Sequence, residues 1–286
     1  MPETTTKQSS ADPRPTAWIL TVGGELLAGD ILDTNAREIS QSLQDAGLLV
    51  TRRLTLPDDV AAIAEAVSAA LAQCDLAVVT GGLGPTPDDV TRDGVALAFG
   101  VGCTLREELR PALEGRYRSY TSRPMPEQNL LQITLPEGAD PIPNPLGTAP
   151  GFRMDRARCA VFVVPGIPRE MRGMLADSVL PWIAAHRGAL PLGVRVLRTM
   201  GIGESDLIQQ HGEFLSGLPG VTVAYYPQQP GEDIKLVALG PDASGCLARA
   251  EAAILERLGA LVYATGSASL PRAVGELLVR RGATVA

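Results

Sequence analysis

Aromatic residues are scarce in this chain of 286 residues, where they make up 4% of the sequence. Proteins that bind single-stranded nucleic acids stack the bases on aromatic side chains, so a broad stacking surface of that kind is excluded. Basic residues are also in the minority, because 25 lysines and arginines stand against 32 aspartates and glutamates, for a formal net charge of −7. No lysine- or arginine-rich run supplies the basic face of a duplex-binding protein. We therefore expect no nucleic acid among the partners.

Histidine and cysteine are too few and too scattered for a zinc site. The two histidines are far apart in the sequence, and none of the four cysteines belongs to a C-x-x-C pair. A structural zinc site needs about four N, S or O ligands, whereas isolated cysteines in apolar runs are typical of small core residues in a reducing cytosol. Any metal would then be held by carboxylates, which favours Mg²⁺ or Mn²⁺.

Membrane and secretion signals are missing as well. No stretch reaches the ~18 apolar residues of a membrane span, and the polar start "MPETTTKQSSADPRP" has no apolar core of a signal peptide. We expect a disordered tail over residues 1–15, a cytoplasmic protein and no membrane partner.

The common signatures of phosphate-handling and covalent enzymes are also absent. The sequence contains no G-x-x-x-x-G-K-[ST] phosphate loop, no G-x-G-x-x-G after the first predicted strand and no G-x-S-x-G elbow. Covalent catalysis has no obvious nucleophile. The reaction type that remains is metal-assisted attack of water on a phosphate ester or anhydride.

Apolar strands alternate with helical patterns in the first two thirds of the chain. This alternation predicts βαβ units, and hence an α/β domain with a doubly wound, mostly parallel sheet over residues 16–190. The order strand, helix, strand, strand, helix, strand then predicts a small α+β domain over residues 191–266. Residues 267–286 begin a further helix and strand. The strands of the first domain are expected at 17–22, 48–54, 75–80 and 157–166, and its helices at 33–47, 57–73, in parts of 105–135 and at 167–186.

The segment "TGGLGPTPDDVTRD" (80–93) follows the third predicted strand. Gly81, Gly82 and Gly84 allow the backbone to approach a ligand closely, and their amides, with the next helix, can receive phosphate oxygens. Two interpretations of Asp88 and Asp89 stay open. They open a helix, where negative charge is favourable, or they hold Mg²⁺ against a pyrophosphate.

Two other glycine-rich turns end strands at the same predicted edge of the sheet, where open parallel sheets bind ligands. They are "GGELLAGD" (23–30) and "PGIPREM" (165–171), and the loop "NPLGTAPGF" (144–152) has a similar composition. Each also fits a plain turn or helix start. Arg92 and Arg169 are candidates to stabilise phosphate charge, and Thr91 to cap the helix or bind ligand. The other candidates on these turns are Glu25, Asn144, Gly147, Thr148, Gly166 and Glu170.

Four segments in this order resemble the competence/damage-inducible protein CinA family. They are "GGELLAGDILDTNA", "VVTGGLGPTPDDVTRDGVA", "NPLGTAPGF" and "VPGIPREM". The resemblance covers residues 16–190 and continues into "RTMGIGESDL" (198–207). It implies a first domain with the molybdopterin-binding fold of molybdopterin adenylyltransferases and a KH-like second domain. It also implies Mg²⁺- or Mn²⁺-dependent hydrolysis of the pyrophosphate of ADP-ribose, which yields AMP and ribose 5-phosphate.

The resemblance also assigns residues to the site. It implies catalytic and metal-binding roles for Asp88 and Asp89, and we add Glu25 as a further catalytic candidate. Gly24 departs from the family, whose members often have Asp or Thr there. The positions implied to bind substrate or phosphate are Asn35, Gly81, Gly82, Gly84, Asn144, Gly147, Thr148, Gly166 and Glu170, to which we add Thr91, Arg92 and Arg169 from their chemistry alone.

Alternatives to hydrolysis remain open at this point. Adenylyl transfer to a pterin needs the same site geometry, and a non-catalytic nucleotide-binding or regulatory protein linked to competence or DNA damage is a third possibility. "AVGELLVRRGATVA" resembles the start of the family's third domain, a nicotinamide-nucleotide amidase, without its nucleophile segment. We expect no amidase activity from this chain, and a homodimer on general grounds.

Overall fold

The computed structural model describes residues 14–186, 192–229 and 231–284. The chain divides into two compact units, Met1–Ala189 and Leu190–Ala286. Most of the tail expected over residues 1–15 lies outside the described residues. Within the described ranges, the helices are too short or too polar to cross a membrane.

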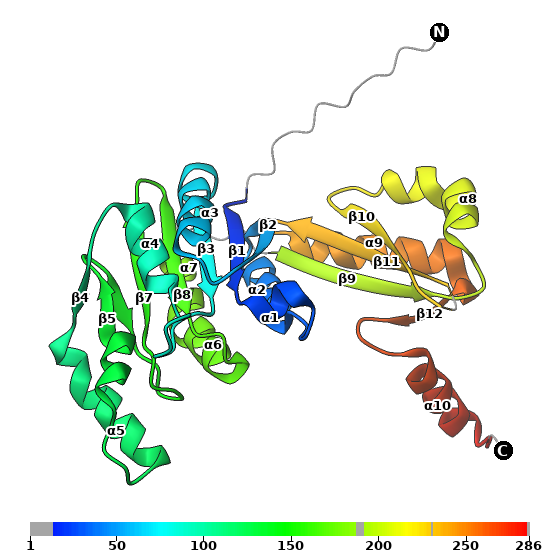
Figure 1. Cartoon of the computed structure of the whole chain (residues 1–286). Coiled ribbons are helices and arrows are strands. Elements are labelled where there is room, and N and C mark those ends of the chain that lie inside the picture. The colour runs from blue at the N-terminus through cyan, green and yellow to red at the C-terminus, as the bar shows by residue number, and fades with distance from the viewer. Residues whose placement is uncertain (1–13, 187–191, 230, 285–286) are drawn as a thin grey trace. The chain divides into compact units, whose positions relative to one another are not determined.

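A six-stranded sheet in the order β2-β1-β3-β8-β7-β6 forms the centre of the first unit (Figure 1). The first four strands of this order pair in parallel, as predicted, and the last two pairings are antiparallel. The predicted α/β fold with a mostly parallel sheet is therefore confirmed. The strands are β1 (Thr16–Val22), β2 (Leu49–Leu56), β3 (Leu76–Thr80), β6 (Asp140–Ile142), β7 (Gly151–Arg156) and β8 (Cys159–Val164).

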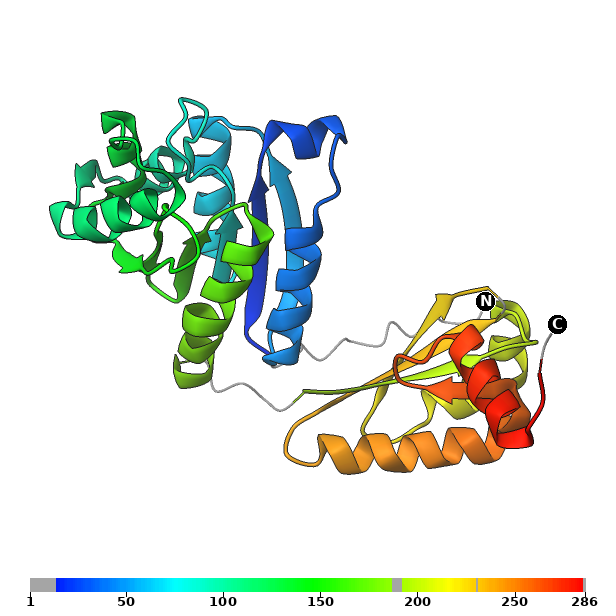
Figure 2. The same cartoon turned by 90° about the horizontal axis from the view of Figure 1, so that it is seen from below.

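Helices cover both faces of this sheet, as the two views show (Figure 1 and Figure 2). Successive residues of a strand point to opposite faces, and in β1 this alternation sends Ile19 into one apolar core and Leu20 into the other. The first core packs against α2 (Thr34–Asp45), α6 (Pro168–Met174) and α7 (Leu180–His186), and the second against α3 (Val60–Gln73) and α4 (Thr91–Phe99). The helix predicted over 167–186 contains a π-helical turn, η3 (Leu175–Val179), between α6 and α7.

Side-chain caps fix where two of these helices begin. The Asp33 carboxylate accepts a hydrogen bond from the Ala36 N–H at 2.8 Å, and Asp59 does the same for the Ala62 N–H. Such caps satisfy main-chain donors that a helix leaves free at its first turn. The Asp33 cap agrees with a helix predicted to begin at residue 33, and it places Asn35 in the first turn of α2.

The region between α4 and β6 carries short elements on one side of the first unit. Its helical content agrees with the prediction for residues 105–135, whereas the strand pair β4–β5 was not predicted. The elements are β4 (Cys103–Leu105), η1 (Glu107–Leu109), α5 (Arg110–Tyr120), η2 (Glu127–Ile133) and β5 (Thr134–Pro136).

The second unit has the predicted order of elements, and all strand pairs of its four-stranded sheet are antiparallel. Apolar residues of the sheet and helices, such as Leu197, Ile234 and Ile254, form its core. The expected last helix is present, but residues 282–284 after it form no strand. The elements are β9 (Leu192–Thr199), α8 (Glu204–Ser216), β10 (Thr222–Pro227), β11 (Glu232–Leu239), α9 (Ala243–Leu258), η4 (Gly259–Leu261), β12 (Val262–Thr265) and α10 (Leu270–Arg281).

Candidate functional site

The crevice of the first unit lies where the strand order reverses. From β1 the chain passes to β2 on one side and then to β3 on the other, so the carboxyl ends of β1 and β3 diverge at a topological switch point. A cavity of about 120 Å³ opens there. Its lining includes Thr21, Glu25, Asn35, Thr80 and Gly166. The structure thus brings together three predicted site residues, Glu25, Asn35 and Gly166.

Asn35 connects three elements at this cavity. Its Nδ2 donates to the Gly166 carbonyl at 2.7 Å and to the Thr80 hydroxyl at 3.2 Å. Its Oδ1 is buried and has no hydrogen-bond donor within the described part of the chain. A buried acceptor without a donor is unfavourable, so this oxygen suits a ligand hydroxyl or N–H.

Glu25 lies in the first turn of the short helix α1 (Gly24–Ala28). Its carboxylate turns back over Gly23, two residues earlier, since a Cβ on Gly23 would lie 2.7 Å from Glu25 Oε1. The Gly24 N–H donates to Asp58 Oδ2 at 2.7 Å. Gly24 therefore contributes a main-chain hydrogen bond at the start of α1.

The glycines of the loop after β3 are required by the fold itself. Gly81 and Gly82 have φ of +107° and +64°, which favours glycine. A Cβ on Gly81 would lie 2.2 Å from the Val22 carbonyl oxygen, and one on Gly82 would lie 2.2 Å from Thr91 Oγ1. Protein atoms already occupy the space next to Gly81 and Gly82 in which we expected a ligand to approach. What this loop can offer a ligand is its main-chain N–H groups.

Three consecutive amides of this loop are free. The N–H of Gly81 donates to the Val164 carbonyl at 3.1 Å, but those of Gly82, Leu83 and Gly84 have no acceptor among the residues that the structure describes. Main-chain N–H groups are strong donors that native structures normally satisfy. Successive free N–H groups in such a turn are a known way to bind an anion.

Arg92 supports the loop from behind. The side chain is 4% exposed, and its guanidinium donates to the carbonyls of Leu83 at 2.7 Å, Gly84 at 3.0 Å and Asp89 at 3.1 Å. Burial lowers the pKa of Arg92, while the nearby Asp89 and Asp93 carboxylates act in the opposite direction. A guanidinium buried under the loop does not reach a phosphate, so the predicted phosphate contact of Arg92 is replaced by a supporting role.

Thr91 has a related supporting role. Its buried hydroxyl donates to the Gly81 carbonyl at 2.9 Å. This bond ties the start of α4 to the first glycine of the loop. The hydroxyl therefore faces the protein, and we assign Thr91 to the loop rather than to a ligand.

Asp88 and Asp89 precede the helix instead of opening it. α4 begins at Thr91 with Val90 as its N-cap, so the interpretation of the two carboxylates as residues of its first turn is wrong. Asp89 Oδ2 accepts from the main-chain N–H of Thr86 at 2.8 Å and from the Thr86 hydroxyl. The Asp88 side chain is exposed.

Asp88 and Asp89 could hold a metal ion only if it retained several water ligands. Among the described residues, His, Cys, Asp and Glu form no group of three or more that could hold a metal. Mg²⁺ usually binds through one or two carboxylates together with substrate phosphates and waters. Asp88 and the free oxygen of Asp89 match that donor set.

The loop over residues 144–148 is held to α6 through Glu170. Asn144 Nδ2 donates to Glu170 Oε2 at 2.7 Å, and Asn144 Oδ1 accepts from the Gly147 N–H at 2.9 Å. Glu170 is buried, and a Cβ on Gly147 would lie 2.0 Å from its Oε2. These three predicted site residues therefore shape the loop.

Thr148 and Arg169 complete this second group of predicted residues. The Thr148 hydroxyl accepts from Gln132 Nε2 at 3.1 Å, and the exposed Arg169 donates to the Leu146 carbonyl at 3.2 Å. Arg116 also donates to that carbonyl. Neither Arg116 nor Gln132 belongs to a motif, so sequence analysis could not find them. Among the described residues, the side-chain hydrogen bonds of Asp89 stay within its own loop, and none joins Asp88 or Asp89 to either group.

Comparison with known proteins agrees with this architecture. Residues 18–185 match the family described as "Probable molybdopterin binding domain", and residues 194–264 match "Damage-inducible protein CinA KH domain". The chain is 40% identical over 281 residues to a CinA-like protein of Frankia casuarinae, with 94% of this chain and 65% of that protein covered. It is 38% identical to a CinA-like protein of Gemmatimonas aurantiaca, with 88% and 60% covered. The chain thus spans less than two thirds of the length of these relatives.

A solved structure supports the same conclusion for the first unit. The protein CinA from Thermoplasma acidophilum, described as having unknown function, is 36% identical, with 57% of this chain and 95% of that chain covered and a TM-score of 0.52. The predicted resemblance is therefore confirmed: the chain belongs to the CinA-like family, with a molybdopterin-binding-type α/β domain followed by a CinA KH domain.

Proposed function

We propose that the first unit binds ADP-ribose at the carboxyl edge of its sheet and hydrolyses the pyrophosphate with the help of Mg²⁺ or Mn²⁺. One observation carries this proposal: the three free amides of Gly82, Leu83 and Gly84 lie in the same loop as the exposed carboxylate of Asp88. The amides suit two linked phosphates, and the carboxylate suits the cation that such phosphates bring with them.

Each part of the site has a task in this proposal. The amides orient the phosphates, Arg92 and Thr91 keep the loop in shape, and Asp88 with Asp89 holds the cation. A cation held there would supply charge neutralisation at the phosphates and a more acidic water. The free Oδ1 of Asn35 accepts a ribose hydroxyl at the neighbouring cavity.

Glu25 is the carboxylate placed to handle a proton. It lines the same cavity as Asn35, at the end of β1. A carboxylate within reach of an attacking water orients it and accepts its proton. We therefore propose Glu25 as the general base.

Product analysis tests the reaction. The protein incubated with ADP-ribose and Mg²⁺ or Mn²⁺ is expected to release AMP and ribose 5-phosphate in equal amounts, because water cleaves one P–O–P bridge. The matched control contains EDTA in place of the metal and is expected to leave ADP-ribose intact.

Two other outcomes would contradict hydrolysis. Turnover that appears only when a pterin acceptor is supplied would favour adenylyl transfer, the activity for which the same fold is also suited. Tight binding of ADP-ribose without any product in the presence of either metal would favour a non-catalytic, regulatory role.

We also propose that the protein is cytoplasmic and forms a homodimer. Cell fractionation tests its location, and light scattering tests its oligomeric state.

A further inference from the structure

Two of the four cysteines meet inside the first unit. Cys74 is the C-cap of α3, and Cys159 is the first residue of β8. Their Sγ atoms lie 3.9 Å apart, and both residues are buried, with exposed fractions of 0% and 1%. The sequence separates them by 85 positions, so the contact arises only from the fold.

The backbone places the two cysteines within the span of a disulfide bond. β3 and β8 are neighbouring parallel strands, in which Leu76 pairs with Ala160 (Figure 1). Extended by one residue, this register places Cys159 opposite Asp75 and next to Cys74. Adjacent strands lie about 4.8 Å apart, and a disulfide joins Cα atoms that are about 4.4–6.8 Å apart. The sulfurs must close from 3.9 Å to about 2.0 Å, a movement that rotation of the side chains supplies.

The surroundings of the pair keep it in the thiol form. The Cys74 Sγ lies 3.2 Å from the Ala70 carbonyl oxygen and 3.1 Å from that of Leu76, both of which accept from a thiol. The contact with the Cys159 thiol, followed by burial, raises the pKa of Cys74. Because the thiolate is the reactive form of cysteine, the pair stays reduced until an oxidant reaches it.

The pair lies just beneath the surface, at the amino ends of β3 and β8. The residues directly before the two cysteines, Gln73 and Arg158, are exposed, and Arg158 belongs to the exposed turn between β7 and β8. Turns and helix ends open locally at a far lower free energy than the core. A small oxidant can therefore reach the sulfurs while the rest of the unit stays folded. The candidate site lies at the opposite, carboxyl edge of the sheet, so the two features are separate.

We propose that Cys74 and Cys159 are a modification site, at which hydrogen peroxide forms a reversible disulfide that links α3 covalently to β8. The thiolate of one cysteine attacks the O–O bond of the peroxide, which gives a sulfenic acid and one water. The second thiol attacks the sulfenic sulfur, so that the S–S bond forms, the S–O bond breaks and a second water leaves. In total the two thiols lose two hydrogen atoms and the peroxide is reduced to two waters. A dithiol reductant reverses the change by thiol–disulfide exchange.

Peptide mapping of the full chain tests the disulfide. The reduced, folded protein is treated with hydrogen peroxide, its remaining thiols are blocked with N-ethylmaleimide in denaturant, and it is digested with trypsin. Lysine and arginine separate the four cysteines, so each cysteine falls on its own tryptic peptide. We expect peptides 54–92 and 159–169 to be linked, two hydrogens lighter than their sum, and to separate on treatment with dithiothreitol. The half-buried Cys103 and Cys246 are internal controls, which we expect outside any link.

Thermal unfolding measures the consequence of the link. A disulfide that closes a long loop restricts the unfolded chain and so favours the folded state. We expect the peroxide-treated protein to unfold at a midpoint about 5 °C or more above that of the reduced protein. Cys159→Ala is expected to abolish both the linked peptide and this shift. The matched control, Cys246→Ser, is expected to keep both.

Three results would overturn the proposal. They are oxidised cysteines without the link between peptides 54–92 and 159–169, a link that forms only after unfolding in urea, and a linked protein whose midpoint does not rise. If Cys159→Ala does not fold, the peptide map and the midpoint of the wild-type protein decide. None of these measurements depends on turnover of ADP-ribose, so they are independent of the proposed hydrolysis.

Discussion

Replacing Arg92 with alanine is expected to lower the free energy of unfolding by about 3 kcal/mol. The buried guanidinium donates to the carbonyls of Leu83, Gly84 and Asp89, and alanine would leave all three without that donor. Each hydrogen bond to a charged group contributes about 1.5–3 kcal/mol, and partial entry of water would offset some of the loss. Urea unfolding followed by circular dichroism measures the effect.

Lysine is not expected to rescue this variant. One ammonium group lacks the planar fork with which a guanidinium serves several carbonyls at once. The control is Arg118→Ala, whose exposed side chain pairs with Glu114 and should change stability by less than about 0.5 kcal/mol. An Arg92→Ala protein of wild-type stability with weakened nucleotide binding would contradict the supporting role and restore a direct phosphate contact.

The variant Asp88→Asn is expected to reduce kcat/KM for ADP-ribose at least a hundredfold, or about 2.7 kcal/mol of transition-state stabilisation. The neutral amide is a poor ligand for Mg²⁺ where few protein carboxylates are present. Because Asp88 is exposed, its replacement should leave the unfolding curve unchanged. Steady-state assays over a range of Mg²⁺ concentrations would show a raised metal requirement.

Asp45→Asn is the matched control for this variant. Asp45 is exposed and ends α2, at the opposite end of that helix from Asn35. Its replacement should leave kcat/KM within twofold of the wild type. If Asp88→Asn and Asp45→Asn behaved alike, the acidic pair would have no part in catalysis.

The edge of the sheet could be predicted because its signals are local and strong. Short apolar runs ending in glycine marked β1 and β3, and Asp33 marked the start of α2. The alternation of strands with helices then predicted that the carboxyl ends of these strands lie at one edge of the sheet. The position of Asn35 beside Gly166 follows from that topology.

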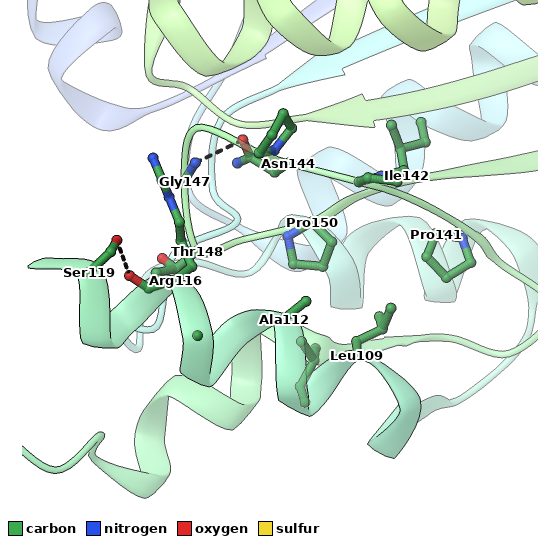
Figure 3. A pocket seen from close by; sticks show the side chains of 14 residues that line it. Leu109, Ala112, Arg116, Ser119, Pro141, Ile142, Asn144, Gly147, Thr148 and Pro150 are labelled. Carbon is green, nitrogen blue, oxygen red and sulfur yellow. Dashed lines mark hydrogen bonds between the residues drawn. The ribbon is translucent and has the colours of Figure 1, made fainter.

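The roles of several residues could not be predicted from the sequence. A motif shows that Arg92 and Gly82 lie near a turn, but it does not show on which side of the backbone their side chains or Cβ positions lie. Glycine is needed at residue 82 because Thr91 fills the adjacent space. The cavity of about 550 Å³ between α5 and the loop over residues 141–150 (Figure 3) could not be predicted, because only the loop carries a motif and nothing in the sequence places α5 beside it.

The antiparallel edge of the sheet was missed for a different reason. β7 contains Arg153, Asp155 and Arg156, so its pattern is less apolar than that of β8. The two strands are joined by a tight turn in which Ala157 has φ of 51°. A short, charged strand followed by a non-glycine turn gives little local indication of a hairpin.

The most direct test of the account follows the main-chain amides of the glycine-rich loop by NMR. A selectively labelled protein is titrated with ADP-ribose and Mg²⁺ at a temperature where turnover is slow, and the amide shifts of Gly82, Leu83 and Gly84 are recorded. The account predicts that these three amides show the largest shifts, and that Asp88→Asn removes the Mg²⁺-dependent part. Saturable binding that leaves all three amides unshifted would contradict it.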